Sequence, residues 1–376
     1  MIYYIGYYDC EKNSHEERKS FPAATNKMKY LISALEEIGE DVVEVVSPAE
    51  TVKYSWVRGR RVTLGKQVSL KTFPSLSGRS KIVRAFGHLV TRLYFFLYLL
   101  THVTDSDQMI VYHSLVYMKE ISLVRKITKC ALIMEVEEIY TDVYEDRQLR
   151  SKEIQFLRSA DKYIFITDLL RREIDEDKKF TIFHGTYRVM PNYDLVFQDG
   201  KTHVVYAGTF NPIKGGVFQA IAAAEYLDES YVLHILGGGS SSEIQNVKSK
   251  ICEMSNKTKC VIRYDGYKCG VEFDAFIQAC HIGLSTQQPE GKYNATSFPS
   301  KILMYMSNGI HVVSVRIPAV ESSAVGSYMY YYDYQDAKSI AEAINAVPRT
   351  TSSGSKIILD RLHSEFVHSL RELLKR

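Results

Sequence analysis

The chain has 376 residues, 45% of them apolar, and a formal net charge of only +3. This length is enough for two packed domains, and the small charge argues against binding nucleic acid along the whole chain. The six cysteines form no Cys-x-x-Cys pair, and the N-terminal Met-Ile-Tyr-Tyr-Ile-Gly is expected to be a short strand rather than a signal peptide. We therefore expect a reducing, cytoplasmic environment.

A zinc site at Cys260, Cys269, Cys280 and His281 is a weaker interpretation than ordinary buried thiols. The spacings are irregular, and two of the cysteines lie in apolar runs that are typical of strands or helices. We expect neither a metal nor a cofactor.

Strands and helices alternate along the first half of the chain. The apolar runs predict strands at Ile2–Ile5, Val42–Val46, Met109–Tyr112, Ala131–Val136, Tyr163–Thr167 and Phe180–Phe183, and helices at Asn26–Ile38 and through Ile154–Ser159. The polar segment Asn192–Thr202 has neither the helical nor the strand periodicity of apolar residues, so we expect a linker there.

The second half repeats the same alternation. Strands are expected at Val204–Ala207, Val232–Leu236, Val261–Tyr264, Ile282–Ser285, Val312–Val315 and Tyr328–Tyr332. Helices are expected at Gly216–Tyr226, Ser242–Asn256, Val271–Ala279, Lys301–Ser307, Ala337–Ala346 and Lys356–Lys375. Repeated β–α units predict an α/β fold with parallel sheets that are covered by helices on both faces.

A glycine turn follows the strand Val204–Ala207, in the sequence Tyr-Ala-Gly-Thr-Phe-Asn-Pro-Ile-Lys-Gly-Gly. Gly208 lets backbone N–H groups approach a phosphate, and Lys214 adds a cation near the next helix start. The segment Ser-Phe-Pro-Ser-Lys ending at Lys301 repeats this arrangement, with Ser297 or Ser300 as the expected helix cap. Two lysines and two helix N-termini predict a diphosphate site, because fixed positive charge stabilises a departing nucleoside diphosphate.

These segments resemble the nucleotide-sugar-dependent glycosyltransferases of the GT-B fold, in particular the family 4 type that builds bacterial surface polysaccharides. The resemblance covers nearly all of residues 203–346 and, more loosely, the first half. It implies two facing Rossmann-like domains: an acceptor-binding domain at 1–195 and a donor-binding domain at 203–350. The helix 356–376 would cross back to the N-terminal domain.

The family's donor residues match this sequence only in part. Lys214 matches the lysine that contacts the donor phosphates, but Thr209 stands where an arginine is usual. Met304 stands where a glutamate usually holds the ribose, and Glu290 is a stand-in for the missing first acid of the pair. Tyr267 is a candidate for stacking on the base. The resemblance implies a nucleotide-diphosphate sugar of the UDP or GDP type as donor.

Residues 51–104 contain no Asp or Glu but ten Lys or Arg, and they include the run Leu-Tyr-Phe-Phe-Leu-Tyr-Leu-Leu that ends at Leu100. The uncharged run is too short to span a bilayer. The region suits contact with an anionic membrane surface. The alternative is a buried helix at Phe86–Val103 between solvated basic loops. No nucleic-acid motif accompanies the charge.

The strand Ala131–Val136 leads into the acids Glu137 and Glu138. Both match positions that face the interdomain cleft in the family, and a carboxylate there would accept a proton from an acceptor hydroxyl or hold that hydroxyl in place. The alternative is a helix start with favourable acids in its first turn. His113, Gly6 and Tyr7 also follow strand ends and are expected on the acceptor side.

The sequence therefore predicts a peripheral glycosyltransferase on the cytoplasmic face of the membrane. It would move a sugar from a nucleotide diphosphate to a lipid-linked or growing glycan. The alternatives are a nucleotide-sugar epimerase of the same architecture and a non-catalytic partner subunit that kept the fold.

Overall fold

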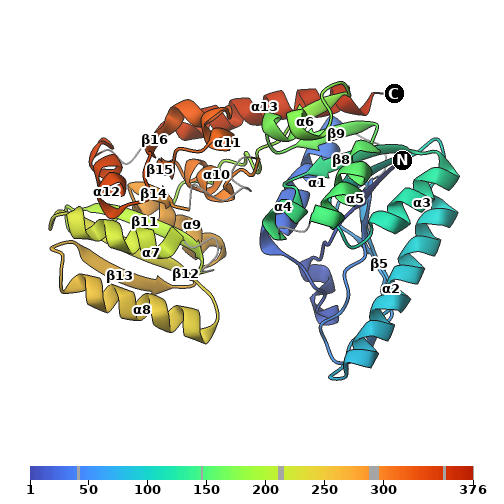
Figure 1. The fold of residues 1–376 in the computed structure, drawn as a ribbon, viewed down its shortest axis with the longest axis horizontal. Helices are drawn as coiled ribbons and strands as arrows, with labels where there is room; N and C mark the ends of the chain where they lie inside the picture. The colour runs from blue at the N-terminus through green and yellow to red at the C-terminus, as the bar shows by residue number, and fades with distance from the viewer. Residues whose placement is uncertain (40–42, 145–146, 211–215, 288–295, 350–352, 376) are drawn as a thin grey trace. The chain divides into compact units, whose positions relative to one another are not determined.

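The computed structural model describes residues 1–39, 43–144, 147–210, 216–287, 296–349 and 353–375 (Figure 1). The chain divides into two compact units. Unit 1 comprises Met1–Thr186 and the residues from Glu365 onward, and unit 2 comprises Tyr187–Ser364.

Unit 1 is built on an eight-stranded sheet in the order β10-β9-β8-β7-β1-β2-β5-β4. Its strands pair in parallel except where β4 meets β5. The strands are β1 (Ile2–Ile5), β2 (Val43–Ser47), β4 (Arg61–Thr63), β5 (Val68–Thr72), β7 (Gln108–Tyr112), β8 (Ala131–Val136), β9 (Lys162–Phe165) and β10 (Phe180–Ile182). A separate antiparallel pair joins β3 (Trp56–Val57) to β6 (Ser75–Leu76).

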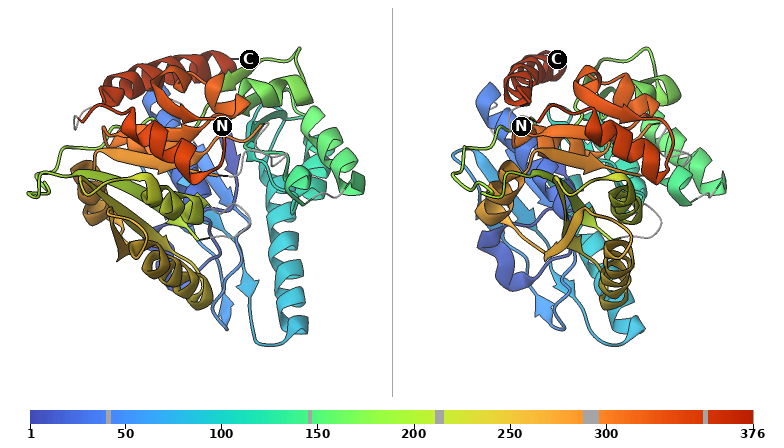
Figure 2. Two further views of the ribbon diagram at one scale, coloured as in Figure 1. Left: turned by 60° about the vertical axis from the view of Figure 1, so that its left-hand side comes forward. Right: turned by 90° about the vertical axis from the view of Figure 1, so that its left-hand side faces the viewer.

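The helices of unit 1 cover this sheet, and Figure 2 shows the long helix α2 beside its strands. Helix α1 begins with Pro22, whose fixed φ suits a first helical position, and ends at Gly39 in the left-handed region (φ 85°). The helices are η1 (Glu11–Glu16), α1 (Pro22–Ile38), α2 (Lys81–His102), α3 (Met118–Thr128), α4 (Tyr140–Tyr144), α5 (Arg147–Arg158) and α6 (Asp168–Ile174).

The last helix, α13 (Ser355–Leu374), begins in unit 2 and ends in unit 1. In unit 1 the Phe366 ring stacks on Phe183 with centroids 4.5 Å apart. The Gln108 amide and the Lys162 ammonium donate to the carbonyls of Leu374 (3.0 Å) and Leu373 (2.7 Å). These side chains satisfy carbonyls that a helix end leaves without partners.

Unit 2 contains a fully parallel six-stranded sheet in the order β13-β12-β11-β14-β15-β16. The strands are β11 (Thr202–Thr209), β12 (Tyr231–Gly238), β13 (Val261–Gly266), β14 (Ile282–Ser285), β15 (His311–Val315) and β16 (Met329–Tyr332). The helices are α7 (Gly216–Ala223), η2 (Ala224–Tyr226), α8 (Ser241–Ser255), α9 (Gly270–Ala279), α10 (Ser300–Ser307), α11 (Pro318–Glu321), η4 (Gly326–Tyr328) and α12 (Ala337–Asn345).

The strand order in unit 2 reverses at β11. The chain moves outward from β11 through β12 to β13 and then returns to β14 on the other side of β11. In open α/β sheets, ligands bind outside the carboxyl ends of the strands at such a reversal. The ends of β11 and β14 are therefore where a ligand site is expected.

The predicted α/β class with two parallel sheets is confirmed, and each strand predicted from the sequence is present within two residues at either end. The short strands between residues 56 and 76 are missing from the prediction. The alternative of a buried helix at Phe86–Val103 is wrong, because α2 begins at Lys81 and its described buried residues are only Gly87, Thr91, Phe95 and Leu99.

Gly283 provides a test of how unit 2 packs. A Cβ on Gly283 would lie 2.3 Å from the Tyr305 ring. This ring is fixed because its hydroxyl accepts a hydrogen bond from Ala207 N–H (2.9 Å) and donates one to Leu284 O (3.3 Å). Gly283→Ala should therefore lower the free energy of unfolding by about 1–3 kcal/mol in urea denaturation. Gly238→Ala, where a Cβ meets nothing within 4 Å, is the control. Equal stability of both variants would contradict the packing.

Candidate functional site

The carboxyl ends of β11 and β14 bring a helix start against a strand end. A Cβ on Gly216, the first residue of α7, would lie 1.7 Å from the carbonyl oxygen of Thr286, which follows β14. The Thr286 hydroxyl in turn donates to the Gly216 carbonyl at 2.7 Å. The N-terminus of α7 is therefore fixed at the strand-order reversal, where its positive dipole end favours an anion.

Lys301, in the first turn of α10, lies at the same edge of the sheet. Its Nζ is 3.8 Å from the centroid of the Tyr206 ring. A Cβ on Gly208 would lie 2.7 Å from Lys301 Cε and 2.8 Å from Nζ. Any side chain at position 208 would therefore displace the ammonium, which is a physical reason for a glycine at this point.

The Lys301 ammonium forms no ion pair with a carboxylate among the residues that the structure describes. Its aromatic partner Tyr206 is buried. Burial lowers the pKa of Lys301 from 10.5 to about 7. The ammonium is thus only partly protonated near neutral pH, and a bound anion would favour its charged form.

The start of α10 differs from the expected cap. Pro299 occupies the N-cap position, and no side chain accepts a hydrogen bond there, so the prediction that Ser297 or Ser300 caps the helix is wrong. Proline has no N–H and its side chain accepts no hydrogen bond. Within the described residues, the N-cap position therefore gives the N–H groups of Ser300 and Lys301 no side-chain acceptor, and a helix N-terminus in this state favours an anion.

The other predicted donor residues have different surroundings. Thr209 ends β11 and is exposed, and Tyr267 follows β13 and is 78% exposed. Met304 is half-buried, one turn after Lys301 in α10. Lys214 and Glu290 lie outside the described residues. The structure thus brings Gly208 and Lys301 together, and Ser300 precedes Lys301 in the first turn of α10.

In unit 1, the acids after β8 lie in a partly buried cluster. Glu137 forms an ion pair with Lys27 of α1, and both side chains are largely buried. Glu135, two residues earlier in β8, is fully buried and accepts a hydrogen bond from the Tyr4 hydroxyl at 2.5 Å. Burial, followed by the charge of Glu137, raises the pKa of Glu135, so this carboxyl favours its neutral form. Glu138 is half-buried just before α4.

His113 lies in the interior of unit 1. Its side chain is fully buried, its Nε2 is 3.3 Å from Glu153 Oε1, and its ring lies 5.0 Å from that of Tyr140. Burial lowers the pKa of His113 to about 3, so the imidazole is neutral. The Glu153 carboxylate accepts from the backbone N–H groups of Tyr140 (2.8 Å) and Thr141 (3.0 Å) at the N-terminus of α4. It therefore fixes the segment that carries Glu138.

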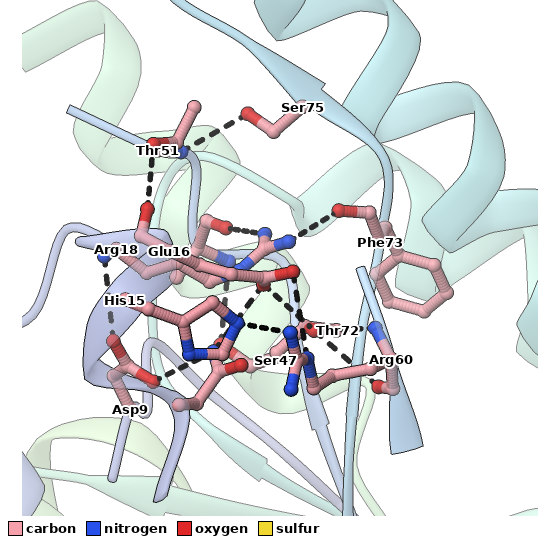
Figure 3. Close-up of polar contacts among 12 residues, drawn as sticks. Asp9, His15, Glu16, Arg18, Ser47, Thr51, Arg60, Thr72, Phe73 and Ser75 are labelled. Carbon is pink, nitrogen blue, oxygen red and sulfur yellow. Dashed lines mark hydrogen bonds and ion pairs between the residues drawn. The ribbon is translucent and has the colours of Figure 1, made fainter. Parts of the chain in front are cut away.

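The segment after β1 is anchored by a buried arginine (Figure 3). Arg18 donates to the carbonyls of Ala49 and Phe73, each at 2.6 Å, and to Glu16 Oε2 at 2.7 Å. Burial alone would raise the pKa of Glu16, but the hydrogen bond and charge of Arg18 hold it below its ordinary value. These contacts fix the segment to the ends of β2 and β5.

Gly6 and Tyr7 begin this anchored segment. A Cβ on Gly6 would lie 2.7 Å from Met28 Cε, so only a glycine fits without a shift of that side chain. The Tyr7 ring stacks on Tyr117 at 6.0 Å and meets the edge of Phe21 at 6.2 Å. Tyr7 thus belongs to an aromatic cluster at the end of β1.

No protein-family model and no curated protein sequence matches the chain. Solved structures do match over its whole length. Sucrose-phosphate synthase from Thermosynechococcus elongatus aligns with a TM-score of 0.68 at 13% identity, covering 99% of this chain and 97% of the other. A UDP-forming alpha,alpha-trehalose-phosphate synthase from Burkholderia xenovorans gives 0.67 at 11%, covering 100% and 99%. Anabaena HepE, in complex with UDP, gives 0.64 at 11%, covering 99% and 97%.

The chain has the GT-B fold. The sequence resemblance had implied this fold, and both units and the C-terminal helix take part in the match. At these identities the similarity establishes architecture alone.

Sequence reasoning missed several residues of these clusters. Lys27 lies in α1 and Tyr4 in β1, both far from β8 in the sequence. Nothing in their local sequence indicates a carboxylate partner. Glu135 was visible as a charged residue inside an apolar run, which is a signal for a buried and perturbed group. Tyr206 had no signal beyond its place in a strand.

The Lys27–Glu137 pair makes a testable contribution to stability. Lys27→Met would leave the Glu137 carboxylate largely buried without its cation, so it should lower the free energy of unfolding by about 3 kcal/mol near neutral pH. The loss should shrink in acid, because protonated carboxyls need no counter-charge.

Urea denaturation at several pH values measures this effect. Lys29→Met is the matched control, because it changes an exposed lysine two residues after Lys27 in the same helix. A loss for Lys27→Met that stays constant with pH would show that packing, and not charge, is responsible.

Proposed function

We propose that this protein is a glycosyltransferase that moves a sugar from a nucleotide diphosphate to a lipid-linked or growing glycan. The acceptor would be an intermediate of surface polysaccharide synthesis, as the family 4 resemblance implies. The reaction would take place at the cytoplasmic face of the membrane.

One observation carries this proposal. A lysine ammonium without a described carboxylate partner lies against Gly208, at the point where the strand order reverses and beside an uncapped helix N-terminus. A diphosphate supplies the negative charge that would neutralise the lysine and the helix N-terminus. Hydrogen bonds between ionised partners are stronger than those between neutral groups. The same groups would stabilise the negative charge that develops on the departing nucleoside diphosphate.

The structural neighbours support the choice of donor. A UDP-forming synthase and a protein in complex with UDP share this architecture along almost the whole chain. We therefore take a UDP-sugar as the first donor to test, with a GDP-sugar as the next. Lys214 would add a second cation, Tyr267 a stacking surface, and Glu290 a contact to the sugar.

On the acceptor side we assign the proton-accepting role to Glu138. Glu137 is engaged by Lys27, and its charge is thereby compensated within unit 1. Glu138 follows Glu137 at the segment that Glu153 holds through the N-terminus of α4. A carboxylate on a fixed backbone suits the orientation of an acceptor hydroxyl.

A non-catalytic subunit is the second candidate, because Met304 offers no carboxylate where the family holds the ribose. Hydrolysis of a panel of nucleotide sugars by the purified protein separates the two. Slow donor hydrolysis that requires Lys301 favours the transferase, whereas binding without turnover, even with glycan acceptors, favours the subunit.

Lys301→Ala should weaken UDP binding by about 10- to 100-fold, since a charged hydrogen bond contributes about 1.5–3 kcal/mol. Isothermal titration calorimetry measures the dissociation constant. Lys338→Ala, which changes an exposed lysine of α12 whose Nζ lies 3.9 Å from Glu342, is the control. Unchanged affinity for UDP in the Lys301 variant would contradict the assignment.

Binding of UDP should also take up a proton. The free lysine has a pKa of about 7, and the bound diphosphate raises it, so affinity should fall as the pH rises above 7. Calorimetry in buffers of different ionisation enthalpy counts the protons. Lys301→Arg keeps its charge throughout this range and should lose the pH dependence. If UDP affinity of the native protein stays level above pH 7, Lys301 does not contact the diphosphate.

A further inference from the structure

Helix α2 carries an apolar stripe on the side opposite the protein core. Its buried residues, Gly87, Thr91, Phe95 and Leu99, follow each other at intervals of four. A second set of large apolar side chains is exposed on another face of the helix, with Ile82 81% and Leu89 64% accessible. We call this set the α2 stripe; it consists of Ile82, Phe86, Leu89, Leu93 and Leu97.

The spacing of the α2 stripe places it on one face. The intervals of four, three, four and four residues recur with the helical period, so the five side chains form one continuous row. Over this span the row is about 22 Å long at 1.5 Å per residue. Isolated exposed leucines are normal on a protein surface, but a continuous apolar row of this length indicates an interaction surface.

The length and composition of α2 alone would allow it to cross a membrane. Its opposite face, however, is attached to unit 1. A Cβ on Gly87 would lie 1.8 Å from the Leu76 carbonyl oxygen, the Thr91 hydroxyl donates to Pro74 O at 3.0 Å, and Arg92 pairs with Glu120 of α3. A spanning helix would have to break these contacts, so the geometry favours a helix that lies in the plane of an interface.

The surroundings of the α2 stripe indicate what covers it. Arg79, Lys81 and Arg84 are exposed around the first turn of α2, and none forms an ion pair with a residue that the structure describes. Beside this end of the helix, strand β3 presents Trp56, which is 48% exposed, and pairs with β6 at Leu76. Basic residues next to apolar and interfacial aromatic side chains match an anionic lipid surface.

A second copy of this chain is a poorer fit. Residues 51–104 contain no acid, so a symmetric dimer across the α2 stripe would bring like charges together at its rim. An anionic bilayer presents both an apolar interior and the opposite charge.

We propose that the α2 stripe docks the protein on an anionic lipid bilayer, with α2 lying in the membrane plane and Trp56 at the headgroup level. This docking deepens the proposed function, because it would hold the enzyme where a lipid-linked acceptor is found. The contact itself requires no donor and no catalysis.

The test uses Trp56, the only tryptophan in the chain, as the reporter. The full-length protein is mixed with phosphatidylcholine vesicles that contain phosphatidylglycerol, and binding is followed by co-sedimentation and by tryptophan emission. We expect binding with a blue shift of the emission, and weaker binding to vesicles of phosphatidylcholine alone or at high salt.

Three double variants distinguish apolar docking from charge attraction. Leu89→Glu with Leu93→Glu places charges in the stripe and should lower vesicle affinity by more than about tenfold. Tyr226→Glu with Ile357→Glu places the same charges on exposed apolar positions of unit 2 and should leave it unchanged. Arg79→Ala with Lys81→Ala should reduce the salt dependence and the preference for phosphatidylglycerol. Melting curves establish that each variant is folded.

The outcomes separate this inference from the proposed function. Vesicle binding that survives in the folded stripe variant overturns the inference, and so does a dimer that this variant converts to monomer in sedimentation equilibrium. UDP affinity measured without vesicles should be the same in all three variants. A protein that docks as described but hydrolyses and transfers no sugar would refute the transferase while leaving the docking surface intact.

Discussion

The Lys301 ammonium lies over the Tyr206 ring and next to the space that a Cβ on Gly208 would fill, and no described carboxylate neutralises it. Keeping a charge in such a place is costly, which is why the pKa of this lysine falls so far. The folding of the rest of unit 2 offsets the free-energy cost of this buried lysine. Gly208 leaves the space, the strand-order reversal leaves the edge open, and the starts of α7 and α10 add dipoles of the same sign. A ligand with two negative charges would neutralise the lysine and interact favourably with both helix N-termini.

Three buried carboxyl groups in unit 1 have different environments that compensate or remove their charge. Glu137 has a cationic partner, Glu153 accepts backbone N–H groups at a helix start, and Glu135 favours its neutral form beside Tyr4. Each solution removes or balances the charge without water. Together they fix the end of β8 and the start of α4, so the backbone around Glu138 is defined before an acceptor arrives.

Much of the fold could be predicted from the sequence, because the central strands of parallel sheets are continuous apolar runs. Strands β8 and β14 were predicted with their observed bounds. The strands between residues 56 and 76 have only two to five residues and are partly exposed, so they carry little periodic signal. Helix α2 was ambiguous because apolar residues occupy both its buried face and its exposed stripe.

The candidate site was predictable only in outline. Glycines and lysines after strands indicated a phosphate site, and Gly208 and Lys301 do lie together. The contact of Lys301 with Tyr206 depends on how α10 packs on β11, and this packing has no local signature. Similarly, the cap of α10 was mispredicted because Pro299 occupies the position at which a serine was expected to bond. The pairing of Lys27 with Glu137 joins residues 110 positions apart.

We propose that the sheet edge at Gly208, with Ser300 and Lys301 of α10, binds the diphosphate of a sugar nucleotide. A crystal structure of the protein with UDP or GDP tests it most directly. We expect diphosphate oxygens within hydrogen-bond distance of Lys301 Nζ and of the first-turn N–H groups of α10. A nucleotide bound elsewhere, with Lys301 still resting on Tyr206 and contacting no phosphate, would contradict it.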